Sequence, residues 1–69
     1  MQNSIVIANG ERIAAELPCT IEQFLKERKL LPRSVVVEHN GQAVAPSEFQ
    51  QRPLNDGDRL EVVHFVGGG

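Results

Sequence analysis

The chain has 69 residues, a formal net charge of −2 at pH 7 and a single cysteine, Cys19. A chain this short folds as one small domain and buries too little surface to support a deep catalytic pocket, which disfavours a self-contained enzyme. The scattered basic residues disfavour a nucleic-acid binder, and one cysteine excludes an intramolecular disulfide. No apolar stretch approaches the length of a membrane span and the first residues do not resemble a signal peptide, so we expect a cytoplasmic protein.

The first 15 residues predict a β-hairpin. Residues 4–8 form a run rich in β-branched side chains, and residues 11–15 return as a second strand. Between them stands Asn9-Gly10, a dipeptide that tolerates the positive φ angles of a tight turn.

One amphipathic helix is expected to follow. Thr20 and Gln23 have the spacing of a capping box, in which each side chain bonds the backbone of the other residue at a helix start. Apolar residues then recur at helical spacing, at Ile21, Phe24 and Leu25. Pro32 is expected to end the helix, because proline has no N–H to donate.

The second half of the chain predicts three more strands. Residues 34–39 and 42–44 form a hairpin around Asn40-Gly41, and residues 59–65 form the last and longest strand after a polar turn at residues 54–58. Between them, residues 46–49 are expected to form a single helical turn, capped by Ser47, with Phe49 in the core. The predicted order is therefore β-β-α-β-β-β.

One helix with one apolar stripe covers only one face of a sheet, so the other face is expected to stay open to solvent. Strand alternation divides the apolar side chains into two sets. The set expected in the core is Ile5, Ile7, Val35, Val37, Leu60 and Val62. The set expected on the other face is Val6, Val36, Val63 and Phe65. This second set either packs against the loop around Phe49 or, together with Val66, forms a docking patch for a partner protein.

The sequence ends in three glycines, Gly67, Gly68 and Gly69. Fully extended, they span roughly 10 Å, and without side chains they fit a narrow channel that any Cβ would block. Glycines are also common in frayed termini, so composition alone does not decide their role.

Residues 56–69, with the sequence DGDRLEVVHFVGGG, resemble the C-terminal signature of the ThiS family of sulfur carriers in thiamin biosynthesis. The resemblance extends over the whole chain in length and element order. It implies an α+β fold of the β-grasp, ubiquitin-like type, in which one helix covers one face of a mixed sheet. Residues 1–66 would form the domain and residues 67–69 a flexible tail.

The resemblance also implies a protein co-substrate that is acted on by partner enzymes and needs no cofactor of its own. An E1-like adenylyltransferase, ThiF, would use ATP and magnesium to adenylate the carboxylate of Gly69. Sulfur from a persulfide donor, supplied by a cysteine desulfurase or similar protein, would then give a C-terminal thiocarboxylate. The thiocarboxylate would serve the thiazole synthase, ThiG, with Gly67 and Gly68 threaded into each partner.

Other residues are given structural roles. His39 and His64 lack further ligands at a recognised metal-binding spacing, so no metal site is expected. Cys19 is interpreted as a packing residue, because no basic neighbour in the sequence lowers its pKa. Basic residues near the end of the helix suit its dipole and are only secondary interface candidates: Lys26, Arg28, Lys29 and Arg33.

Two alternatives remain at this stage. The chain could be a β-grasp sulfur carrier of another pathway, such as molybdopterin synthesis or tRNA thiolation. It could also be a β-grasp interaction module without covalent chemistry, in which the glycines carry no function.

Overall fold

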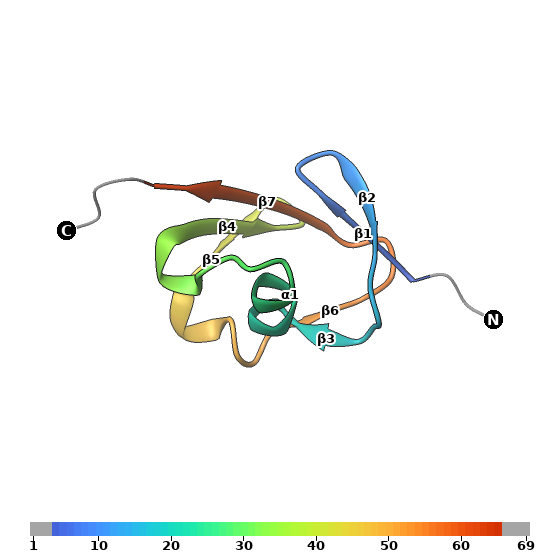
Figure 1. The fold of residues 1–69 in the computed structure, drawn as a ribbon, viewed down its shortest axis with the longest axis horizontal. Coiled ribbons are helices and arrows are strands. Elements are labelled where there is room, and N and C mark those ends of the chain that lie inside the picture. The colour runs from blue at the N-terminus through green and yellow to red at the C-terminus, as the bar shows by residue number, and fades with distance from the viewer. Residues whose placement is uncertain (1–3, 66–69) are drawn as a thin grey trace.

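The computed structural model describes residues 4–65, which form a five-stranded mixed sheet with one α-helix packed on one face (Figure 1). The strands lie in the order β2-β1-β7-β4-β5. Their bounds are Ile5–Ala8 for β1, Glu11–Ala14 for β2, Val35–His39 for β4, Gln42–Val44 for β5 and Arg59–His64 for β7. The first and last strands, β1 and β7, are parallel neighbours at the centre, and the other pairs are antiparallel.

The helix α1 spans Ile21–Glu27 and begins with the predicted capping box. The Thr20 hydroxyl accepts a hydrogen bond from the Gln23 N–H at 3.1 Å, and the Gln23 side-chain oxygen accepts one from the Thr20 N–H at 2.9 Å. Both bonds are local, which is why sequence spacing alone predicts them.

The helix ends before the predicted position. Lys29 adopts a positive φ of 61°, its N–H bonds the Lys26 carbonyl and the N–H of Leu30 bonds the Leu25 carbonyl. This pattern is a Schellman motif, which satisfies the last carbonyls of a helix and reverses the chain. Pro32 therefore does not end the helix, and instead begins a short 3₁₀ turn at Pro32–Ser34.

A second, two-stranded sheet lies next to the start of the helix (Figure 1). The strands β3, Cys19–Thr20, and β6, Pro53–Leu54, pair antiparallel, and neither was predicted. The helical turn expected at residues 46–49 is present as a 3₁₀ turn, Pro46–Glu48, and Phe49 is buried as predicted. The predicted Ser47 cap is wrong, because Ala45 occupies the capping position without a side-chain bond.

The core lies between α1 and the covered face of the sheet. It confirms Val35, Val37 and Leu60 as core residues, with Val62 partly buried beside them. The phase predicted for β1 is wrong: Val6 and Ala8 are buried, whereas Ile5 and Ile7 are only half-buried. Every residue of β1 is apolar, so the sequence pattern could not show which alternate set faces the helix.

Candidate functional site

The strand β7 occupies the centre of the sheet and leads into the end of the chain. It pairs with β4 over residues 60–64, from His39↔Leu60 to Val35↔His64. On its other side it pairs with β1 only at Ile7↔Arg59 and Ala8↔Leu60. Figure 1 shows the β1–β2 hairpin beside the first part of β7, with the end of β7 reaching beyond it.

Asn9 extends this pairing by one step. Its backbone N–H bonds the Leu60 carbonyl at 2.9 Å, and its side-chain oxygen accepts a bond from the Val62 N–H at 2.7 Å. Its side-chain amide donates in turn to the Val62 carbonyl at 3.0 Å. The Asn9 side chain thus supplies the hydrogen bonds to Val62 that a continued β1 backbone would otherwise supply.

The second Asn-Gly turn is used in the same way. The N–H of Asn40 bonds the Arg59 carbonyl, and its side-chain oxygen accepts a bond from the Arg59 N–H at 2.8 Å. Asn9 and Asn40 both have a φ of 51°, which asparagine tolerates better than most residues. The sequence signal was interpreted only as two turns, and the role of the two side chains in holding β7 was missed.

Asp58 ties the beginning of β7 to three other residues. Its carboxylate accepts bonds from the Asn55 N–H, from His39 Nε2 at 2.8 Å and from Asn40 Nδ2. Burial alone would raise the pKa of Asp58, but these donors favour the charged form and hold the pKa below its usual value. Arg52 lies 3.5 Å from the other ring nitrogen of His39 and can only donate, so a proton on Nε2 satisfies both contacts.

The end of β7 presents apolar side chains to solvent. Val36 and Val63 face each other across β4 and β7 on the open face and are 55% and 60% exposed. Phe65, whose N–H bonds the Ser34 carbonyl at 3.2 Å, is 45% exposed. These three residues, which we call the open-face patch, are therefore not packed against the loop around Phe49.

Five predicted site residues fall outside this patch or outside the described structure. Val6 is fully buried under the helix, so its assignment to a partner interface is wrong for the same reason as the phase of β1. Val66 and the glycines at 67–69, with the predicted boundary between domain and tail, lie outside the described residues.

Two carboxylates border the open-face patch. Glu38 and Glu61 are directly opposed in the β4–β7 register, and both are exposed. No ion pair involves either of them within residues 4–65. Like charges placed opposite each other weaken a sheet, so this pair gives the fold no stability of its own.

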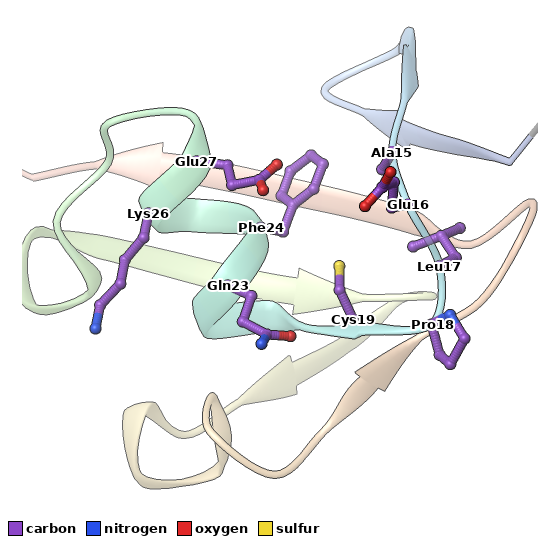
Figure 2. Close-up of a pocket in the computed structure, with 9 residues that line it drawn as sticks. All are labelled: Ala15, Glu16, Leu17, Pro18, Cys19, Gln23, Phe24, Lys26 and Glu27. Carbon is purple, nitrogen blue, oxygen red and sulfur yellow. The ribbon is translucent and has the colours of Figure 1, made fainter.

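Cys19 lies in a groove between α1 and the segment that leads into β3 (Figure 2). Its neighbours there include Leu17, Phe24 and Glu27. Burial raises the pKa of the Cys19 thiol, and the Glu27 carboxylate raises it further. Because thiolate is the reactive form, this groove does not activate the sulfur, in agreement with a packing role.

The remaining polar candidates do not assemble into a site. In the part of the chain that the structure describes, no three His, Cys, Asp or Glu side chains are placed to hold a metal ion. His39 is bound to Asp58, and His64 is exposed on β7. Lys26 is 3.9 Å from Glu22, while Arg28, Lys29 and Arg33 are exposed. Among residues 4–65, no helix is long and apolar enough to cross a membrane.

Comparison of the sequence with known proteins finds relatives that match most of this chain. The model of the ThiS family matches residues 3–69. A sulfur carrier protein ThiS from Bacillus subtilis is 38% identical over 50 residues, covering 72% of this chain and 76% of the relative. A thiazole synthase from Paramagnetospirillum magneticum is 41% identical over 64 residues, covering 93% of this chain; this chain thus spans only about a fifth (20%) of that relative's length.

The solved structures agree with the sequence comparison. A crystal structure of a thiamine biosynthesis protein, ThiS, from Geobacter metallireducens superimposes with a TM-score of 0.80 at 26% identity, covering 94% of this chain and 99% of the other. This confirms the predicted β-grasp fold, with its mixed sheet and helix on one face. The chain therefore belongs to the ThiS family.

Proposed function

We propose that this chain is a sulfur carrier of thiamin biosynthesis that donates sulfur from its C-terminal glycine for the thiazole ring. The observation that carries the proposal is the match of the ThiS family model across residues 3–69, a range that includes the three glycines. The relative in Bacillus subtilis is itself named a sulfur carrier protein. The arrangement of β7 supports the proposal, since a firmly held strand leads directly toward the reacting end.

In the proposed cycle the carrier supplies the substrate and its partners supply the catalysis. A carboxylate is a poor acyl donor, so an adenylyltransferase of the ThiF type joins the carboxylate of Gly69 to AMP and releases pyrophosphate from ATP. The terminal sulfur of a persulfide then attacks the acyl carbon and AMP leaves. A thiol opens the resulting S–S bond and releases the thiocarboxylate, whose sulfur passes to the thiazole synthase, ThiG.

The open-face patch is the proposed contact surface for these partners. Val63 and Phe65 lie within a few residues of Gly69 in the sequence, and Val36 lies opposite Val63 on β4. Exposed apolar side chains gathered in one place are typical of interaction sites. The raised pKa of the Cys19 thiol argues only against this thiol as the point of sulfur attachment.

Intact-mass measurement tests the carrier chemistry. The protein is incubated with a ThiF-type adenylyltransferase, Mg-ATP and a persulfide source, and the C-terminal peptide is then examined. We expect the mass increase that corresponds to replacement of one oxygen by sulfur. The control is a variant that lacks Gly69, which should stay folded and gain no sulfur.

Two outcomes would contradict the proposal. If the intact protein gains no sulfur, the carrier chemistry is wrong and an interaction module is favoured. If sulfur is gained but the gene does not rescue a thiamin auxotroph, the carrier belongs to another pathway, such as molybdopterin synthesis or tRNA thiolation.

A further inference from the structure

The two edges of β7 differ in how completely they are paired. Backbone groups of alternate residues in a strand point to the same edge of the sheet. On the β1 side, the Leu60 carbonyl is bonded by the Asn9 backbone and the N–H and carbonyl of Val62 are bonded by the Asn9 side chain. The next residue on this edge is His64.

Among residues 4–65, no group bonds the backbone N–H or carbonyl of His64 on this edge. Its neighbours Val63 and Phe65 point their backbone groups to the other side, where β4 pairs with Val63 and the Ser34 carbonyl accepts the Phe65 N–H. Among residues 4–65, this edge is therefore closed by Asn9 up to Val62 and open at His64.

In the described part of the chain, neither residue directly beside His64 is a proline or a charged residue. Proteins block exposed edges with proline, with charged side chains or with a covering loop. Here Val63 and Phe65, on either side of His64, are exposed apolar residues. An open backbone edge beside apolar side chains is the combination that accepts an added strand.

We propose that the edge of β7 at His64 receives an extended backbone segment of the thiazole synthase, which adds a strand to the sheet beside Val63 and Phe65. This inference rests on the proposed function. The choice of partner is argued from the relatives: a segment like this chain occurs within thiazole synthases from Paramagnetospirillum magneticum and Magnetococcus marinus, so carrier and synthase share one polypeptide there. A strand added at this edge would also fix the direction in which the following residues enter the partner.

Amide hydrogen exchange of the labelled full chain, alone and with purified thiazole synthase, tests this directly. In the free protein we expect rapid exchange at His64 and slow exchange at Phe65, whose N–H is bonded to β4. In the complex, exchange at His64 should slow at least tenfold. If His64 exchanges equally fast in both states while the signals of Val63 and Phe65 shift, the partner binds the face alone and the strand-addition proposal is wrong.

A second outcome also overturns the proposal. If His64 becomes protected in the free protein as its concentration rises, the edge is occupied by a second copy of the chain and not by the synthase.

A pair of variants provides an independent measurement. His64→Pro removes the backbone N–H, and His64→Ala removes the imidazole but keeps the N–H. Neither disturbs the hydrogen bonds to β4, and Val63 already has the extended backbone that a following proline requires. We expect the proline variant to bind the synthase about fivefold more weakly than the alanine variant, as the loss of one backbone hydrogen bond implies.

Equal affinities of the two variants would overturn the inference even if wild type gains sulfur normally. Conversely, absence of sulfur on wild type would overturn the proposed function, whatever the two variants show in binding. Circular dichroism and urea unfolding check that both variants fold. If His64→Pro does not fold, the exchange experiment decides alone.

Discussion

The two halves of β7 are built differently, although they belong to one strand of six residues. At the beginning, Leu60 has β1 on one side and β4 on the other, and Arg59 pairs with β1 and is bonded on its other side by Asn40. The side chains of Asp58 and Asn40 are bonded to each other beside this part of the strand. At the end, Val63 and His64 are paired with β4 alone among the described residues, and the side chain of Val63 is exposed.

The first half of β7 therefore contributes mainly to the stability of the fold, and the second half exposes groups that a partner can bind. The buried contacts and the charge-assisted hydrogen bonds lie at the beginning of β7. The end of the strand can therefore expose apolar side chains and an open edge with little loss of folding stability. Substitutions in the first half should therefore change the free energy of unfolding, whereas substitutions in the second half should change partner binding.

Leu60→Ala and Val63→Ala form the sharpest pair for this comparison. Leu60 is fully buried, so its truncation leaves a cavity and should lower the free energy of unfolding by about 2–5 kcal/mol. Val63 is 60% exposed, so its truncation should cost less than about 0.5 kcal/mol while weakening synthase binding. Urea unfolding and a binding titration measure the two effects, and similar unfolding costs for both variants would contradict the division of β7.

Asp58→Asn should give the next largest effect, and it should depend on pH. The folded protein holds the pKa of Asp58 below its usual value, so this carboxylate stabilises the fold above the unfolded pKa of about 4 and the contribution is lost as pH falls through the lower folded pKa. At pH 7 we expect a loss of about 1–2 kcal/mol, from weakened charge-assisted hydrogen bonds. Urea unfolding of wild type and variant should show this difference shrinking toward pH 3, and a constant difference would count against it.

Asn9→Gly should lower the free energy of unfolding less than Leu60→Ala and Asp58→Asn do, and its effect should be the most local. Glycine keeps the positive φ of this turn but removes both side-chain bonds to Val62, so we expect a loss of about 1 kcal/mol. Amide exchange at Val62 should become faster. Asn40→Gly is the matched control, because it should expose the Arg59 amide and leave Val62 protected. Equal exchange at Val62 in both variants would show that Asn9 does not close this edge.

The features that sequence reasoning predicted well depend on residues close together in the chain. The capping box of Thr20 and Gln23 and the two Asn-Gly turns are local patterns, and all three are present. The placement of Val36 and Val63 on the face away from the helix was also predicted, because one helix cannot cover both faces of a sheet. Whether they pack against the loop around Phe49 or face solvent was decided by the structure.

The features that were missed depend on contacts between distant segments. The apolar run of β1 fits either phase, and only its pairing with β7 places Val6 under the helix. The ladder of β3 and β6 has two residues in each strand, too few for a periodic pattern. His39 looked like an ordinary strand residue, and its burial against Asp58 becomes visible only in three dimensions.

For the candidate site, the sequence predicted apolar residues at the end of the last strand but not how the edge of that strand is arranged. The side chain of Asn9 reaches a residue 53 positions away in the sequence, and no local pattern indicates such a bond. The place where the edge opens therefore had to come from the structure.

The pairing of β7 with β4 has a mechanical consequence. A partner that draws the end of the chain into a channel pulls along β7, and the hydrogen bonds of β7 to β4 lie across that direction. Such a pull shears these bonds together and does not peel them away one after another. The domain should therefore resist unfolding when a partner pulls on the end of the chain.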